Sequence, residues 1–492
     1  KDFVRDWCVG FKELKARVDE YPLERVEEIT GVDRKLIAEA ARIYANADGA
    51  IIPWTPITDM QISSTSAIRL HSILRAVTGN LDIAGGETFG GFNQSYIPES
   101  EMALHEELSI EQKAKQLGYD DHPVYTYRVA EMLKEPTEKV WGYPYADIVM
   151  GCHMANPSNV FRAMVSSDPY PVKAFFVLGN NALMSYPNQH QILKAMMNQD
   201  LIVAHEIFMT PTAMLADYVL PGDVFTERNH IADGWSWTTA LRLSQKVVEP
   251  AEEITSTYQF WKDLAERFDL GNHFPWESLE EVIDHRLSRS GRTFSEFEQS
   301  GYMELQDFEP RKYLKTGFAT PSGKVELSSS ILDELGFDPL PYYREGPALT
   351  EEFPYAVFSG VREDPFFQTG QRNIPELRSR CPLPSVYIHT DDAKKEGLVD
   401  GDWIELQTAY GKVTAELSVQ ESMKQGHLRV PHGWWYPELR GDETLAGAFI
   451  SSDAVLCSDD DEFLDYEQGI PHFKGYPGRV VKVEKPAQLE AS

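Results

Sequence analysis

The sequence predicts an α/β protein whose C-terminal part is a β-rich domain. Three patterns support this fold class. Between residues 172 and 206, an apolar run, a helical segment and a second apolar run alternate, as they do in a parallel βαβ unit. Residues 22–46 and 65–79 space their apolar side chains three to four apart, which indicates amphipathic helices. From residue 345 onward, several short segments alternate apolar and polar residues, which favours a closed β-barrel.

Each predicted element follows from a local pattern. Residues 49–54, GAIIPW, are expected to form a buried strand. Gly79 is expected to end the helix over 65–79, because glycine readily adopts the left-handed conformation of a helix C-cap. In the βαβ region we expect strands over 172–178, 200–206 and 216–222 and a helix over 188–198. In the C-terminal part we expect strands over 355–360, 385–390, 403–408, 412–419 and 427–435, and a short helix over 391–397.

Composition excludes several classes of function. The net charge of −31 opposes binding to nucleic acid or to anionic membranes, so neither is an expected partner. No run of 18 apolar residues is present, so no membrane span is expected. The four cysteines are far apart, which indicates a reducing, cytoplasmic setting without a disulfide framework or zinc site. The N-terminus reads as a helix already under way, and we expect the chain to be part of a larger protein.

Polar side chains follow two of the predicted parallel strands. Gly179, Asn180 and Asn181 come after one strand, and Glu206 ends the next. Ligands of open α/β sheets bind beyond the carboxyl ends of the strands, so these residues are candidate ligand contacts. A carboxylate such as Glu206 can accept two N–H groups from a guanine edge. The alternatives are an Asx-turn for the asparagines and a solvated surface acid for Glu206.

Two further segments are candidate phosphate sites. Thr210 and Thr212 precede a short helical turn, where hydroxyl and free N–H groups can meet a phosphate; helix capping is the alternative. Arg362 is a forked donor in an acidic protein, and its alternative is an ion pair with Glu363 or Asp364. The common catalytic motifs HExxH, GxSxG and GxxxxGK[ST] are missing, and GNNALMS lacks the GxGxxG pattern of a nicotinamide-linked dehydrogenase.

Several segments, taken in order, resemble the molybdopterin oxidoreductases of the dimethyl sulfoxide reductase type. Within this family the chain is similar to acetylene hydratase-like and catechol dehydroxylase-like enzymes. The resemblance implies Rossmann-like parallel-sheet domains followed by a C-terminal double-psi-type β-barrel, and it implies only the C-terminal two-thirds of such an enzyme. The segments that carry it are TGNLDIAGG (78–86), VLGNNALMSYPN (177–188), EIFMTPTAMLADYVLPG (206–222), TPSGKVEL (320–327), FSGVREDPFF (358–367) and DDAKKEGLVDGDWIELQTAYGKV (391–413).

The resemblance implies a cofactor, namely two molybdopterin guanine dinucleotides around one Mo or W ion. A [4Fe-4S] cluster is expected in the full-length protein but not on this chain, and no metal ligand or catalytic residue is assigned here. Phe residues in the barrel loop depart from a His that is common in the family. The implied cofactor contacts are Thr58, Asp59, Gly179, Asn180, Asn181, Ser185, Glu206, Phe208, Thr210, Thr212, Asp217, Arg362, Phe367, Gln368, Thr369, Ser452 and Lys474.

The resemblance also sets the expected organisation and function. We expect the end of one α/β domain at 1–58, a dinucleotide-binding α/β domain at 59–250, a mixed connecting region at 251–344 and the cofactor-binding barrel at 345–492. The expected activity is either oxidoreductase chemistry or non-redox hydration of a small molecule, with this chain inactive alone. The expected partners are the missing N-terminal segment and, as a candidate, an electron-transfer subunit. The alternative is a non-catalytic cofactor-binding or assembly remnant.

Overall fold

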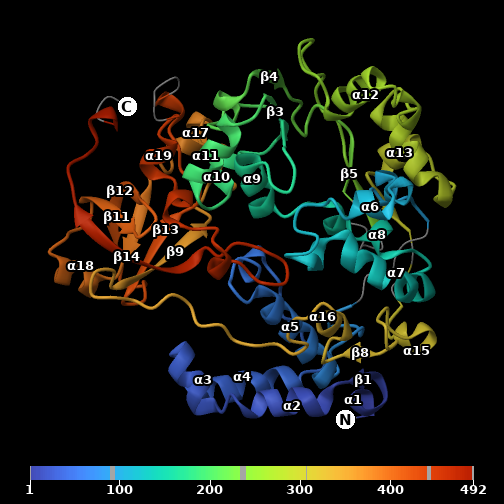
Figure 1. Cartoon of the computed structure of the whole chain (residues 1–492), viewed down its shortest axis with the longest axis horizontal. Coiled ribbons are helices and arrows are strands. Elements are labelled where there is room, and N and C mark those ends of the chain that lie inside the picture. Colours follow the sequence, from blue (N-terminus) through green and yellow to red (C-terminus); the bar gives the residue numbers. More distant parts are fainter. Residues whose placement is uncertain are drawn as a thin grey trace.

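The computed structural model describes residues 2–88, 95–232, 240–305, 307, 309–439 and 445–489. Figure 1 shows helices at the N-terminal end, a small parallel sheet beside a helical region, and a barrel formed by the C-terminal part. The fold is therefore mixed α/β with parallel pairing and a closed barrel, as the sequence predicts. Within the described ranges, no helix is long and apolar enough to span a membrane.

Helices dominate the first 80 residues. The predicted helix over 22–46 is divided, because Gly31 ends its first half at φ +66° and Asp33 caps its second half by accepting the Lys35 N–H. Gly79 ends α5 at φ +83°, which confirms the predicted C-cap. The elements are α1 (Asp2–Trp7), β1 (Cys8–Val9), α2 (Phe11–Asp19), α3 (Leu23–Thr30), α4 (Arg34–Asn46), the 3₁₀ turn η1 (Pro56–Thr58) and α5 (Ser64–Thr78).

The strand predicted over 49–54 is wrong. Its backbone is bound by side chains instead of by a neighbouring strand: the Ala50 N–H donates to Asn80 Oδ1 at 2.9 Å, and the Ile52 N–H donates to Glu87 Oε1 at 2.8 Å. Because side chains accept these two N–H groups, the apolar run stays an extended segment that leads to η1. Periodicity could not reveal this, since both acceptors lie some 30 residues further along the chain.

A three-stranded parallel sheet confirms the predicted βαβ unit. Strand β2 (Ala174–Leu178) pairs with β3 (Leu201–Glu206), and β3 pairs with β4 (Tyr218–Pro221). Leu183 and Met184 in the short helix α10 pack with Ile192 in α11 in a common core. Upstream of the sheet and between its strands lie the helices α6 (Ile110–Lys113), η4 (Pro123–Tyr125), α7 (Tyr127–Trp141), α8 (Tyr145–Ile148), α9 (Pro157–Ser166), α10 (Ala182–Ser185), α11 (Gln189–Met197) and η6 (Ala213–Leu215).

The connecting region combines a small antiparallel sheet with short helices. Strand β6 lies between β5 and β7, and this sheet packs with Ile283 and Phe297 in one core. Strand β8 instead pairs with β1 in parallel near the N-terminus. The elements are β5 (His230–Ala232), β6 (Ala240–Ser244), α12 (Thr257–Arg267), α13 (Leu279–Leu287), α14 (Phe294–Ser300), β7 (Tyr302–Glu304), α15 (Tyr313–Thr316), β8 (Val325–Glu326) and α16 (Ser330–Glu334).

The C-terminal part closes into a six-stranded barrel in the order β10-β12-β11-β14-β9-β13. The strands predicted over 403–408 and 412–419 are confirmed as β11 and β12, which pair antiparallel as a hairpin. Alternate side chains of the strands point inward and form the core, as the alternating pattern predicts. The elements are β9 (Tyr355–Val361), α17 (Pro375–Arg378), β10 (Ser385–Ile388), α18 (Thr390–Glu396), β11 (Trp403–Thr408), β12 (Lys412–Val419), β13 (His427–Pro431), α19 (Ala448–Ser451), η11 (Asp453–Leu456) and β14 (Lys474–Lys482).

A fully buried carboxylate holds the end of this barrel together. Asp453 accepts the N–H of Gly360 at 2.6 Å and the N–H of Gly433 at 2.7 Å, and it lies 3.2 Å from His432 Nδ1. Burial alone would raise the pKa of Asp453, but His432 and the two N–H groups stabilise the charge and hold the pKa below its ordinary value. One side chain therefore joins η11 to β9 and to the segment after β13.

Removing this carboxylate should destabilise the barrel. We expect Asp453→Ala to lower the free energy of unfolding by about 3 kcal/mol, because two backbone donors and His432 lose their acceptor inside the protein. Urea denaturation followed by tryptophan fluorescence measures the change. Asp333→Ala, at an exposed position of α16, is the control and should stay within about 0.5 kcal/mol of the parent. Equal stability of both variants would contradict the role given to Asp453.

Candidate functional site

The first part of the site is the turn that follows β2. Gly179 has φ +58°, and its N–H donates to the His205 carbonyl of β3 at 3.0 Å. No atom lies within 4 Å of the position that a Cβ would take at Gly179, so open space borders the turn. Asn180 is exposed on the same turn. The carboxyl end of β2 therefore presents a backbone bend and an exposed amide at the place where the strand-end rule expects a ligand.

Asn181 connects this turn to the segment after β3. Its Oδ1 accepts the Thr212 hydroxyl at 2.8 Å and the Thr212 N–H at 3.3 Å, while Thr212 Oγ1 accepts the Leu183 N–H at 3.0 Å. The Asx-turn alternative is therefore wrong for Asn181, and so is helix capping for Thr212. Asn181 Nδ2 is buried and has no partner among the described residues. An unpaired buried donor is costly, and this one fits a ligand acceptor.

The carboxyl end of β3 supplies the acidic group. Glu206 Oε1 accepts the N–H of Ile207 at 2.9 Å, and burial raises the pKa of Glu206 above its ordinary value. The N–H groups of Ile207 and Phe208 both stabilise the charged carboxylate, but burial has the larger effect on its pKa. Glu206 is thus partly buried at the carboxyl end of β3, where the sequence predicts a guanine-binding acid. It is not a fully solvated surface acid.

Four other predicted contacts near the sheet have local structural partners. Thr210 Oγ1 accepts the Ala213 N–H at 3.2 Å, which is the capping role that the sequence leaves open. Asp217 is exposed, and its Oδ2 accepts the Ile202 N–H at 2.7 Å at the edge of the sheet. The Phe208 carbonyl accepts the N–H of Thr210, and the Ser185 N–H donates to the Asn181 carbonyl. The bonds of Thr210, Phe208 and Ser185 shape the turns around Asn181 and Glu206, whereas the Asp217 bond lies at the opposite, amino ends of β3 and β4.

The second part of the site is the barrel loop after β9. The Arg362 guanidinium lies 4.5 Å from the centre of the Phe367 ring, and Phe367 is exposed. The alternative of an ion pair for Arg362 is wrong, because Glu363 pairs with Arg429 and Asp364 pairs with Arg380. Arg362 therefore keeps its charge available for an anionic ligand, on an aromatic platform that orients it.

A buried arginine that sequence reasoning missed fixes this loop. Arg372 donates to the Gln368 carbonyl and to the His432 carbonyl, both at 2.7 Å, and burial lowers the pKa of Arg372 to about 9. Trp435 Nε1 donates to the Thr369 carbonyl at 2.7 Å. In the sequence, Arg372 carries no signal beyond its place in QTGQR, since both partners are backbone carbonyls and one of them, that of His432, is distant in sequence.

Close packing joins the barrel loop to the sheet turn. A Cβ at Gly433 would overlap the Thr369 side chain and would lie 3.5 Å from the Met184 carbonyl of α10. Trp435 packs in the same core as Leu183 and Met184. The structure thus brings Thr369 next to the segment that follows Asn181, although the two are almost 190 residues apart in sequence.

Ser452 and Lys474 lie around the buried Asp453. Ser452 is buried, and its Oγ accepts the Ala454 N–H and so caps η11. Lys474 donates to the Ser359 carbonyl, and burial lowers the pKa of Lys474. Lys474 also borders a cavity of about 560 Å³, whereas Ser452 faces the protein interior.

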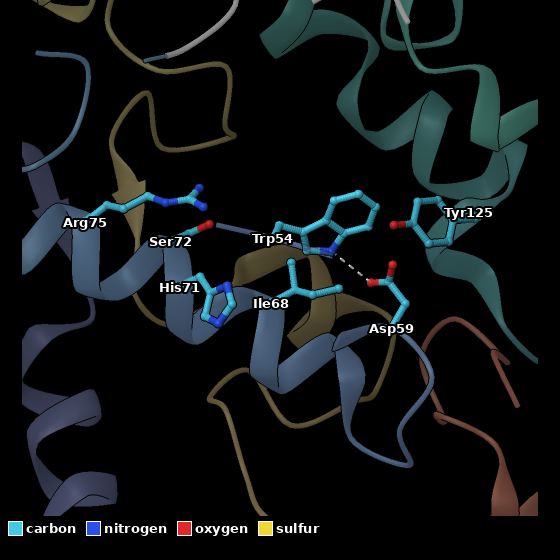
Figure 2. Close-up of a pocket in the computed structure, with 7 residues that line it drawn as sticks. All are labelled: Trp54, Asp59, Ile68, His71, Ser72, Arg75 and Tyr125. Atoms are coloured by element: carbon cyan, nitrogen blue, oxygen red, sulfur yellow. Dashed lines mark hydrogen bonds between the residues drawn. The ribbon is translucent and has the colours of Figure 1, made fainter. Parts of the chain in front are cut away.

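Thr58 and Asp59 lie apart from these groups, in and after η1. Asp59 borders a cavity of about 470 Å³ (Figure 2), and its Oδ1 accepts Trp54 Nε1 at 3.3 Å. The other side chains that line it are Ile68, His71, Ser72, Arg75 and Tyr125. Burial raises the pKa of Asp59, and the charge of Asp465 adds to this effect.

The donor set fits an anionic ligand that also accepts hydrogen bonds. Asn181 offers an unpaired buried amide, Gly179 leaves space beside it, and Arg362 offers a free guanidinium. The described ranges contain no cluster of three or more His, Cys, Asp or Glu residues that could hold a metal ion. The four cysteines are free, and three of them are buried.

Two family models match the chain. Residues 61–267 match "Molybdopterin oxidoreductase", and residues 357–462 match "Molydopterin dinucleotide binding domain". The first range contains the sheet turn with Asn181 and Glu206, and the second contains the barrel loop with Arg362 and Thr369. Both halves of the candidate site therefore lie in segments that a molybdopterin-binding family model recognises.

Curated relatives with several activities are similar to the chain. Acetylene hydratase of Syntrophotalea acetylenica is 45% identical over 487 residues, which cover 96% of this chain and 66% of that protein. Formate dehydrogenase H of Escherichia coli is 26% identical, covering 88% and 58%, and dopamine dehydroxylase of Eggerthella lenta is 23% identical, covering 87% and 49%. The chain thus spans about half to two thirds of these relatives. They do not support a non-catalytic remnant or an inactive fragment.

Removal of the Asn181 side chain should reduce stability. We expect Asn181→Ala to lower the free energy of unfolding by about 1–3 kcal/mol, because the buried N–H and hydroxyl of Thr212 lose their acceptor. Chemical denaturation measures the effect. Asn180→Ala changes the same residue type at the neighbouring exposed position and should cost less than about 0.5 kcal/mol. Similar losses in the two variants would show that the bonds to Thr212 do not stabilise the turn.

The similarity to acetylene hydratase extends to three-dimensional structure. Acetylene hydratase from Pelobacter acetylenicus matches with a TM-score of 0.93 at 43% sequence identity, covering 98% of this chain and 67% of that one. The sheet turn and the barrel loop described above therefore belong to a fold that a solved member of the family shares. Together with the two family models, this similarity shows that the chain belongs to the molybdopterin oxidoreductase family.

Proposed function

We propose that this chain is part of a molybdenum- or tungsten-dependent enzyme of the acetylene hydratase type, which adds water to a carbon–carbon triple bond. The observation that carries this proposal is the 45% identity to acetylene hydratase over 96% of the chain. The relatives that oxidise formate or remove a hydroxyl group are 26% and 23% identical. This difference favours hydration without net redox over oxidoreductase chemistry.

In this proposal, the chain's own residues hold a bis(molybdopterin guanine dinucleotide). Asn181 Nδ2 donates to a cofactor acceptor, and the remaining acceptor positions of the Glu206 carboxylate take N–H groups of the guanine edge. Arg362 contacts an anionic or ring portion of the cofactor from the barrel side. Local donors of this kind are required, because a net charge of −31 repels phosphate at longer range.

The bound cofactor would supply a metal ion that acts as a Lewis acid. The four cysteines of this chain are dispersed and free, so a [4Fe-4S] cluster would need ligands from other residues of the full-length protein. The choice between Mo and W, a cytoplasmic location and an electron-transfer partner stay predictions. A net hydration requires no electron transfer, so that partner is not needed for turnover.

The activity is tested on the full-length protein purified without oxygen. We expect acetylene to be converted to acetaldehyde, measured by coupling the product to NADH oxidation through alcohol dehydrogenase. The metal and the guanine nucleotide released per protein are determined on the same sample. A preparation that contains Mo or W and guanine nucleotide but forms no acetaldehyde would contradict hydration. Absence of metal and nucleotide would contradict the cofactor.

Retention of the cofactor tests the role of Glu206. We expect Glu206→Gln to weaken guanine binding by about 1–3 kcal/mol, because an amide N–H replaces one acceptor and leaves a base N–H unpaired. The measurement is guanine nucleotide released per protein after denaturation. Glu334→Gln, at an exposed position of α16, is the control and should retain the parental content.

The pH dependence of nucleotide retention gives a second test of the role of Glu206. Because burial raises the pKa of Glu206, this carboxylate takes up a proton at a higher pH than an exposed glutamate does. The protonated form loses an acceptor, so the parent should lose nucleotide as the pH falls through this folded pKa. Glu206→Gln should lack that step. Identical pH profiles and unchanged nucleotide content would remove Glu206 from the site.

A further inference from the structure

The cavity in Figure 2 has an aromatic and apolar end that contains a carboxylate. Trp54 and Asp59 reach it from the segment around η1, Ile68 from α5 and Tyr125 from η4. His71, Ser72 and Arg75 continue along the same face of α5. Three segments that are distant in sequence thus build one space of about 470 Å³, which is large enough for a small molecule.

The Asp59 carboxylate in this space has few protein partners. Among the described residues it accepts one hydrogen bond, the 3.3 Å contact from Trp54 Nε1, and it forms no ion pair. A carboxylate has about four acceptor positions, so most of its capacity faces the cavity. Burial raises the pKa of Asp59, in agreement with a carboxylate that the protein leaves poorly compensated.

The cation that lines the same cavity does not compensate Asp59. Arg75 is paired with Glu87, whose other oxygen accepts the Ile52 N–H at 2.8 Å. The charge of Arg75 is therefore already balanced by Glu87, and it does not neutralise Asp59. Tyr125 lies on the side of Trp54 and Asp59 in Figure 2, and the charge of Asp59 helps to raise the pKa of Tyr125. The space thus favours a molecule that donates a hydrogen bond to Asp59 and places an apolar part against Trp54 and Ile68.

We propose that Asp59 is a specificity-determining residue, and that the cavity binds a small unsaturated alcohol. The apolar part of this molecule lies against Trp54 and Ile68, and its hydroxyl donates to the Asp59 carboxylate. This inference rests on the proposed function, since it names the substrate class of that reaction. An unsubstituted hydrocarbon such as acetylene gains no hydrogen bond from this carboxylate, so the alcohol should bind there more tightly than the hydrocarbon.

Calorimetric binding to the cofactor-loaded, full-length protein tests the inference without turnover. The probes are prop-2-yn-1-ol and its methyl ether, which share the alkyne and the oxygen but differ in the hydroxyl donor. We expect the parent to bind the alcohol about 10- to 100-fold more tightly, as for a hydrogen bond to a charged acceptor. Asp59→Leu should abolish this preference, and Asp59→Asn, which keeps an acceptor for Trp54, should reduce it. Asp333→Asn should keep it.

Each outcome decides a separate point. Equal binding of the two probes by the parent, or a preference that persists in Asp59→Leu, would overturn the inference. Loss of guanine nucleotide from both Asp59 variants would also overturn it, because Asp59 would then be a cofactor contact. Preferential binding of the alcohol by a protein that hydrates neither the alcohol nor acetylene would support the role of Asp59 and contradict the proposed function. Hydration of acetylene by a parent that binds the two probes equally would support the proposed function and contradict the role of Asp59.

Discussion

The carboxylate of Asp453 is the interaction on which the geometry of the barrel end depends. It is buried, it carries a charge, and it accepts two backbone N–H groups while lying beside His432. A buried charge is tolerated only when its partners are fixed, so Asp453 constrains the ends of β9 and of the segment after β13 together. Gly433 lies at that junction, where it contacts Thr369. The position of the cofactor-binding loop is therefore a consequence of satisfying one charge.

A buried polar side chain also fixes the geometry of the turn that follows β2. Asn181 Oδ1 and Thr212 satisfy each other and the Leu183 N–H, and this holds the turns after β2 and β3 at a fixed separation. What remains unsatisfied is one amide N–H group, Asn181 Nδ2. Structural bonds thus orient the asparagine so that its donor stays available. The free charge of Arg362 on the barrel loop has a similar origin, since neighbouring acids are paired with other arginines.

Much of the fold could be predicted from the sequence, and the failures have physical causes. The βαβ unit and the β11–β12 hairpin follow from local periodicity, and both are confirmed. Strand β14 was missed because Gly475, Pro477 and Gly478 interrupt its apolar pattern. Gly478 is required there, since a Cβ would overlap Val357 on the neighbouring strand β9. The extended segment 49–54 looked like a strand because its acceptors are distant side chains.

In the candidate site, too, some residues could be predicted from the sequence and others could not. Strand-end position identified Asn181 and Glu206, because the carboxyl ends of parallel strands meet at one edge. Arg372 and Asp453 could not be identified, since each acts through backbone atoms that only the tertiary fold brings near. The sequence also could not separate residues that shape the turns, such as Thr210 and Asp217, from residues that face a ligand.

An experimental structure of the cofactor-loaded protein tests the central claim most directly. The claim is that the turns after β2 and β3 and the barrel loop form one dinucleotide cradle. The account predicts a cofactor acceptor within about 3.2 Å of Asn181 Nδ2 and a guanine edge on the Glu206 carboxylate. A dinucleotide bound away from both side chains, or an Asn181 amide that donates only to protein, would contradict it.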